Sequence, residues 1–244
     1  MHVGLVSLFP ELVTDALQYG VVGRAKHNGL LKLAIENPRD FAQDVHRTVD
    51  DRPFGGGPGM VMKPAPLLKA IDAVKDRIGD QAKVVYLSPQ GQLFDQSMAR
   101  AWQQFGSVIL VSGRYEGIDE RVINRAVDQE VSLGNFVLSG GEFAALAVID
   151  AVTRLVPGVL GDPLSSEEDS FGVDGLLDCP HYTRPEDYAG QTVPKVLLSG
   201  DHKAIARWRR QQAISKTWQC RPELLEAADL TEEDIVFLTS LKAG

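Results

Sequence analysis

The chain has 244 residues, of which 44% are hydrophobic and 24% are charged, and its net charge is −8 at pH 7. This composition is typical of a soluble globular protein, and no apolar run approaches the length of a membrane span. The first ten residues carry no Lys or Arg before their apolar part and no small-residue cleavage site, so we expect a strand, not a signal peptide, and a cytoplasmic protein. Cys179 and Cys220 are the only cysteines, which excludes a disulfide framework and predicts two reduced thiols.

Strand and helix patterns alternate along the first 160 residues. Residues 2–8 predict a first strand, and residues 11–19 predict a short helix closed by Gly20. Residues 64–78 have a proline near the start and apolar side chains at helical spacing, which indicates a helix. Further strands are expected at 31–36, 83–87, 108–111 and 129–133, and further helices at 95–105, with Asp95 as N-cap, 119–126 and 141–156. This order predicts an α/β domain at 1–160 with a mainly parallel sheet.

The segment at 44–62 is rich in glycine but does not match a dinucleotide-binding fingerprint. Its glycines at 55, 57 and 59 enclose a proline, no clear strand precedes them, and no helix begins directly after them. We therefore expect a mobile loop.

The last third of the chain shows a different pattern. Residues 161–174 are rich in Gly, Ser and Glu, which predicts a linker. Helices are expected at 201–215 and 231–241, with a helix start at Pro222 and an extended piece at 193–198. We therefore expect residues 175–244 to form a small, mostly helical second domain.

Three of the predicted strands each end in a polar loop that contains glycine. The loops are residues 88–92, 112–121 and 134–142. In a parallel sheet such loops meet at one edge, where open α/β folds bind ligands. Taken alone, the 134–142 loop could equally be a tight connection between a strand and a helix. The presence of three such loops favours a binding site whose glycines leave backbone N–H and C=O groups accessible.

A basic segment follows near the C-terminus. Residues 202–221 contain no Asp or Glu, and Trp208 and Trp218 lie among their six Lys and Arg side chains. A basic segment with interleaved aromatic residues suits RNA. On these residues alone, an amphipathic helix with solvated cations and buried tryptophans is slightly favoured.

Several longer motifs together resemble one family. They are RPFGGGPGM at 52–60, GRYEGIDER at 113–121, GNFVLSGGE at 134–142, EDSF at 168–171 and GLLDCPHYTRP at 175–185. In this order they resemble the TrmD family, the bacterial tRNA (guanine-37-N1)-methyltransferases of the SPOUT class, over residues 1–225.

The resemblance implies methyl transfer from S-adenosylmethionine to N1 of guanosine 37 in tRNA, next to the anticodon, in support of reading-frame maintenance. It also implies a deep trefoil knot in the cofactor-binding domain, tRNA binding by the C-terminal domain, and a homodimer with a shared active site. Magnesium use is a further implication, although no metal-ligand spacing appears and we predict no metal ligand.

The chemistry requires a base and a cation, because guanine N1 holds a proton near neutral pH and its removal places negative charge on O6. The resemblance assigns these roles to Asp169 and Arg154. From the residues alone, Asp169 belongs to a solvated acidic linker, and Arg154 simply complements the dipole at a helix C-terminus.

The cofactor site is expected to use mainly backbone groups and apolar cover. Glu116 could face the positive end of the cofactor or cap the helix that begins near Asp119. The residues expected to bind the cofactor are Tyr86, Leu87, Ser88, Pro89, Gly91, Gly113, Tyr115, Glu116, Ser132, Leu133, Gly134, Asn135, Phe136, Val137, Leu138, Gly140 and Gly141.

Three positions depart from the family pattern. Asn135 stands for a usual Asp, Phe136 for a usual Tyr, and Ala144 for a usual Pro. An RNA-binding protein that keeps the scaffold without catalysis is the main alternative. A nucleotide-binding hydrolase or dehydrogenase is disfavoured, because the chain lacks a phosphate loop, a Rossmann fingerprint and a catalytic triad.

Overall fold

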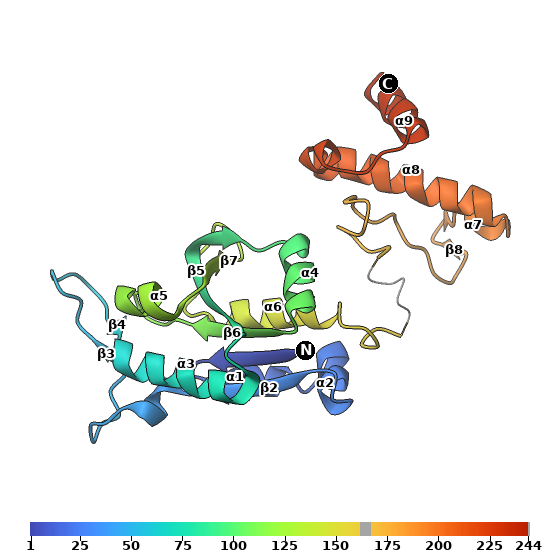
Figure 1. Cartoon of the computed structure of the whole chain (residues 1–244). Coiled ribbons are helices and arrows are strands. Elements are labelled where there is room, and N and C mark those ends of the chain that lie inside the picture. The colour runs from blue at the N-terminus through green and yellow to red at the C-terminus, as the bar shows by residue number, and fades with distance from the viewer. Residues whose placement is uncertain (162–166, 244) are drawn as a thin grey trace. The chain divides into compact units, whose positions relative to one another are not determined.

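The computed structural model describes residues 1–161 and 167–243 (Figure 1). The chain divides into two compact units, Met1–Gly161 and Asp162–Gly244. Residues 162–166 of the expected linker lie outside the described residues. No helix in the described ranges combines the length and the apolar character that crossing a membrane requires.

A five-stranded sheet forms the centre of the first unit. Its strands are β1 (His2–Val6), β2 (Lys32–Glu36), β5 (Lys83–Leu93), β6 (Ser107–Ser112) and β7 (Gln129–Ser132). Their order across the sheet is β2-β1-β6-β5-β7, and every neighbouring pair is parallel. The prediction of an α/β unit with a mainly parallel sheet is therefore confirmed.

Helices cover both faces of this sheet, because the strands are apolar on both sides. The helices are α1 (Pro10–Ala16), α2 (Gly20–His27), α3 (Pro64–Ile78), α4 (Gln96–Phe105), α5 (Glu120–Ala126) and α6 (Glu142–Thr153), with a 3₁₀ turn at Pro38–Phe41. Val108 and Leu110 of β6 face a core shared with α1, α2, α4 and α6, whereas Ile109 and Val111 face α3 and α5.

Local sequence signals explain the bounds of the predicted helices. Asp95 caps α4 as predicted, since its carboxylate accepts the Met98 N–H at 2.8 Å. Gly106 ends α4 in the left-handed conformation at φ 74°, which suits glycine. The helix predicted at 64–78 matches α3.

Three predictions about elements were wrong. Gly20 does not close the first helix: α1 ends at Ala16, and Gly20 begins α2. The strand predicted at 83–87 continues to Leu93, because after a register shift Gln92 and Leu93 pair with β7. The extended piece predicted at 193–198 contains the helix α7 (Lys195–Leu198), which begins directly after Pro194.

The segment expected to be a mobile loop contains two short strands. β3 (Asp50–Asp51) and β4 (Val61–Met62) pair antiparallel, and the glycines lie between them. Phe54 in this connection is fully exposed.

The second unit is mostly helical. It contains the hairpin β8 (Asp187–Tyr188) and β9 (Gln191–Thr192), then α7, α8 (His202–Cys220), a 3₁₀ helix at Pro222–Glu226, and α9 (Glu232–Ala243). Leu176, Ile214 and Leu238 form its small core. Arg210 of α8 binds neighbouring segments of this unit. Its guanidinium donates to Asp174, to Asp234 at 3.0 Å and to the Asp229 carbonyl at 2.7 Å.

Candidate functional site

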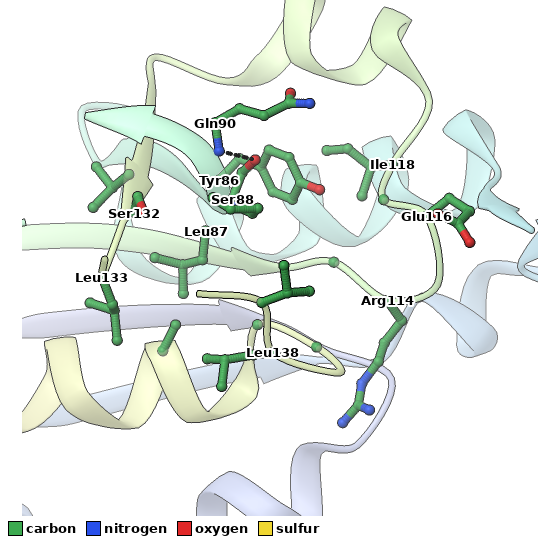
Figure 2. A pocket seen from close by; sticks show the side chains of 18 of the residues that line it. Tyr86, Leu87, Ser88, Gln90, Arg114, Glu116, Ile118, Ser132, Leu133 and Leu138 are labelled. Atoms are coloured by element: carbon green, nitrogen blue, oxygen red, sulfur yellow. Dashed lines mark hydrogen bonds between the residues drawn. The ribbon is translucent and has the colours of Figure 1, made fainter. Parts of the chain in front are cut away.

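A cavity of about 400 Å³ lies at the carboxyl ends of β6 and β7 and beside the middle of β5, where the register of β5 shifts (Figure 2). Most of its lining comes from three segments, Tyr86 to Gln90, Gly113 to Ile118 and Ser132 to Gly141. The sheet therefore brings together residues that are far apart in sequence, at the edge where open α/β folds bind ligands.

One wall of the cavity is the buried ring of Tyr86. A Cβ atom on Gly113 would lie 2.8 Å from the Tyr86 hydroxyl oxygen, so only glycine allows the β6 loop to pass over this ring. Burial, and secondarily the negative charge of Glu130, raise the pKa of Tyr86. The hydroxyl therefore stays protonated at neutral pH.

The loop between β7 and α6 packs closely on the β6 loop. The Gly141 N–H donates to the Gly113 carbonyl at 3.0 Å, and Arg114 and Gly140 form an antiparallel bridge. A Cβ atom on Gly141 would lie 2.7 Å from the Ser112 Cα, so a side chain there would push backbone apart. Apolar side chains of Leu87, Leu133 and Leu138 provide cover (Figure 2).

All the residues predicted to bind a cofactor line this cavity except Gly91 and Asn135. Gly91 instead lies inside β5, where an added Cβ would be 2.2 Å from the Val131 backbone nitrogen. Asn135 is exposed. Of the other positions that depart from the family pattern, Phe136 and Ala144 both line the cavity.

Sequence reasoning missed several lining residues. They are Gln90, Arg114, Gly117, Ile118, Glu120, Ile123, Val131, Ser139 and Ala144. Most of them lie inside the three predicted loops, so taking each whole loop as the site would have included them. Ile123 and Ala144 lie inside helices, where the sequence carries no signal that distinguishes a lining side chain from a core side chain.

Glu116 places a carboxylate beside the cavity. Its side chain contacts the glycine-rich connection between β3 and β4, because a Cβ on Gly59 would be 2.2 Å from Glu116 Oε1. Asp119 accepts the Arg121 N–H at 2.9 Å and is the N-cap of α5, so Glu116 is not needed as the helix cap. Hydrogen bonding from Arg121 lowers the pKa of Asp119. Glu116 thus remains available to face a cationic ligand.

The two residues expected to be catalytic belong to different units. Arg154 follows α6 as its C-cap and is half-buried. Asp169 lies in a turn of the second unit, where its carboxylate accepts the Ser170 N–H at 2.8 Å and its carbonyl accepts the Gly172 N–H at 2.9 Å. Neither is among the described residues that line the cavity.

The basic segment forms α8, and half of its cations are paired. Arg207 contacts Glu233 at 2.6 Å, Arg210 contacts two aspartates, and Arg221 contacts Glu223. Lys203, Arg209 and Lys216 are exposed and form no ion pair with another residue that the structure describes.

The two tryptophans of α8 lie in different surroundings. Trp218 packs on the small core, as expected for an amphipathic helix. Trp208 lies 6.3 Å from the Tyr182 ring, between ring centroids, and both rings line a second cavity with Arg184 and Arg209.

One group of described side chains could hold a metal ion. Ligand atoms of Asp178, Cys179 and His181 lie within 4.8 Å of one another. His181 Nε2 is 2.7 Å from Asp178 Oδ2, and burial, followed by the Asp178 charge, raises the pKa of the Cys179 thiol. Mg²⁺ takes oxygen ligands, so this sulfur and imidazole set does not fit it.

Comparison with known proteins agrees with the motifs. The family profile described as tRNA (Guanine-1)-methyltransferase TrmD matches residues 1–227. A protein of Idiomarina loihiensis named tRNA (guanine-N(1)-)-methyltransferase is 56% identical over 243 residues, covering 100% of this chain and 96% of its own length. Proteins of the same name from Tolumonas auensis and Yersinia enterocolitica are also 56% identical, over 98% and 99% of this chain and 95% and 98% of their own lengths. The chain therefore belongs to the TrmD family of tRNA (guanine-1)-methyltransferases.

Proposed function

We propose that this protein transfers a methyl group from S-adenosylmethionine to N1 of guanosine 37 in tRNA. The observation that carries the proposal is the cavity at the ends of β6 and β7 and beside β5, which is lined by two of the motifs that resemble the family, at 113–121 and 134–142. In the cell this activity would help to maintain the reading frame and would take place in the cytoplasm.

The cavity suits S-adenosylmethionine in shape and chemistry. Backbone groups of the glycine loops can bind the edge of the adenine ring, and the leucines can cover its faces. Glu116, which lines the cavity, offers a negative charge for a cationic group. When bound, S-adenosylmethionine supplies a methyl group on a positively charged sulfur that is already activated for transfer.

The chain's own residues then have to prepare the nucleophile. Asp169 would accept the proton from guanine N1 as general base, and Arg154 would stabilise the negative charge that develops on O6. The acidic neighbours Glu167 and Glu168 are both exposed, whereas Asp169 is half-buried and fixed by the turn. This difference supports Asp169 as the base. The Asp178, Cys179 and His181 group does not fit magnesium, which takes oxygen ligands, so we assign no magnesium ligand.

The organisation of the molecule completes the proposal. Residues 1–160 would form a SPOUT-like cofactor-binding domain whose β6 and β7 loops belong to a deep trefoil knot, residues 161–174 a linker, and residues 175–244 a helical tRNA-binding domain. The exposed cations of α8 and the Tyr182–Trp208 pair support RNA binding by this last part. Two copies would form a homodimer in which Arg154 of one copy and Asp169 of the other share an active site.

Methyl transfer from labelled S-adenosylmethionine to two unmodified tRNA transcripts tests the function. The transcripts differ only at position 37, which is G in one and A in the other. We expect label on the G transcript alone, recovered as 1-methylguanosine. Cofactor binding without label on either transcript would refute the tRNA assignment, and label on both would refute the base specificity.

A further inference from the structure

A fully buried carboxylate lies directly behind the β7–α6 loop. Glu142, the first residue of α6, has no exposed surface. Its Oε1 accepts a hydrogen bond from Ser7 Oγ at 2.8 Å, and its Oε2 lies 2.9 Å from Arg114 Nη2. Burying a carboxylate is costly unless a cation and hydrogen bonds compensate for the lost water. Glu142 is not among the cavity-lining residues, so its contacts serve the protein and not a ligand directly.

Arg114 connects this carboxylate to the loop itself. Its Nη1 donates to the Ser139 carbonyl at 3.2 Å, and its guanidinium stacks 4.5 Å from the centre of the Phe9 ring. In Figure 2 the side chain points away from Tyr86 and Leu87. It passes so close to Gly140 that an added Cβ would be 2.2 Å from Arg114 Nε. Arg114 lines the cavity, but its guanidinium is directed at the loop backbone and at Glu142, so the arginine supports the loop.

Backbone hydrogen bonds also hold the loop, such as that from the Gly141 N–H to the Gly113 carbonyl, and the Ser132 hydroxyl donates to the Gly134 carbonyl. Asn135, Phe136, Val137 and Leu138 are all exposed, so these side chains do not anchor it in the core. A loop that binds a ligand through backbone groups must nevertheless hold those groups in place before the ligand arrives.

We propose that Arg114 and Glu142, with Ser7, are positioning residues that hold the 134–141 loop in its ligand-binding conformation. This inference rests on the proposed function, since S-adenosylmethionine is the ligand whose affinity it concerns. The contacts join the segments that follow β1, β6 and β7, and they act on the donor side of the reaction, not on tRNA.

The test compares S-adenosylmethionine affinity in Glu142→Gln and Arg114→Gln with wild type. We expect the Kd and KM for S-adenosylmethionine to rise about tenfold or more in each, because each change removes the buried ion pair and leaves its remaining charge without a partner there. The KM for tRNA and the kcat at saturating S-adenosylmethionine should stay close to wild type. Ser7→Ala, which removes one neutral donor, should raise the same KM by about threefold.

Coupling between the two residues gives a second readout. Two amides can still bond each other, so the Arg114→Gln, Glu142→Gln double variant should lose less affinity than the two single losses combined. Glu36→Gln is the control, because Glu36 is a partly buried carboxylate that is also paired with an arginine, Arg77 at 2.6 Å, and it does not line the cavity. It should leave the KM for S-adenosylmethionine unchanged.

Three outcomes would overturn the proposal. The first is an unchanged affinity for S-adenosylmethionine in folded Glu142→Gln. The second is a loss of this affinity in Arg114→Gln but not in Glu142→Gln, which would make Arg114 a direct ligand contact. The third is a rise in the KM for tRNA equal to the rise in the KM for S-adenosylmethionine. If the Arg114 and Glu142 variants fail to fold, Ser7→Ala still tests the proposal. An unchanged KM for S-adenosylmethionine in Ser7→Ala would contradict it. Wild-type protein that neither binds S-adenosylmethionine nor methylates tRNA would refute the proposed function instead.

Discussion

Asp169 differs from its acidic neighbours in how it is held. Its carboxylate accepts the Ser170 N–H, and its side chain is half-buried. If it is the general base, Asp169→Ala should lower kcat by about 10²- to 10⁴-fold and leave the Kd for S-adenosylmethionine unchanged. Single-turnover methylation and calorimetric binding measure the two effects. Glu168→Ala is the control, and an equal loss of kcat in that variant would contradict the special role of Asp169.

Arg154 also has an ordinary explanation, since a cation after the last turn of a helix stabilises the helix dipole. A catalytic role predicts a loss of turnover that helix stability does not explain. We expect Arg154→Ala to lower kcat by about 10²-fold or more with little change in melting temperature. Arg24→Ala removes an exposed cation from the last turn of another helix, α2, and should leave kcat unchanged. Near-wild-type turnover in Arg154→Ala would refute the assigned role.

The residue scale also shows what the sequence could reveal. Glycines such as Gly113 and Gly141 could be predicted, because their position after a strand and next to polar residues marks a ligand loop. The pairing of Arg114 with Glu142 could not, because nothing in the local sequence indicates which distant side chain compensates a buried charge. Asp169 and Arg154 were found only through the resemblance, since their surroundings alone favour ordinary surface roles.

At the scale of elements, close packing of the β6 and β7 loops sets the shape of the cavity. Gly141→Ala would place a methyl group 2.7 Å from the Ser112 Cα, so backbone would have to move. We expect the Kd for S-adenosylmethionine to rise about tenfold, equivalent to about 1.4 kcal/mol of binding free energy. Gly161→Ala is the control, because no atom of the described residues lies within 4 Å of its Cβ position. An unchanged affinity for S-adenosylmethionine in Gly141→Ala would mean that the close packing of the β6 and β7 loops is not needed for binding.

Helix α8 offers a prediction about tRNA. Arg209 is exposed and forms no ion pair with any described residue, whereas Arg221 contacts Glu223. If Arg209 binds a phosphate, Arg209→Ala should weaken tRNA binding and reduce the slope of log K against log salt by about one. Filter binding at several salt concentrations measures this slope. Arg221→Ala should have a smaller effect, and equal effects would mean that α8 acts only through its total charge.

Most elements of the first unit were predictable, because buried parallel strands and amphipathic helices have distinct patterns. Periodicity placed α3, and a capping residue placed α4. The continuation of β5 to Leu93 was not predictable, since Gly91 and its polar neighbours read as a loop and only pairing with β7 makes them strand. A local sequence pattern does not indicate which distant segment will pair with a strand.

At the scale of the whole molecule, the assignment of Arg154 and Asp169 to different copies can be tested by mixing. In a dimer of one Arg154→Ala copy and one Asp169→Ala copy, one of the two shared sites would contain both native residues. Co-refolding equal amounts of the two inactive variants should therefore restore about one quarter of wild-type activity. A monomeric protein in sedimentation, or mixed variants that stay inactive, would contradict a shared site.

The order of strands has a consequence for how this protein is made. β1 leaves the ribosome first, but its inner neighbour is β6, and His2 lies opposite Ser107. β5 emerges before β6 and cannot complete the sheet, because β6 lies between it and β1. Pairings between such distant segments form slowly and leave apolar strands exposed meanwhile. A nascent chain that ends before β6 thus has no edge on which to build the cavity, so the ability to bind a ligand arises late in synthesis.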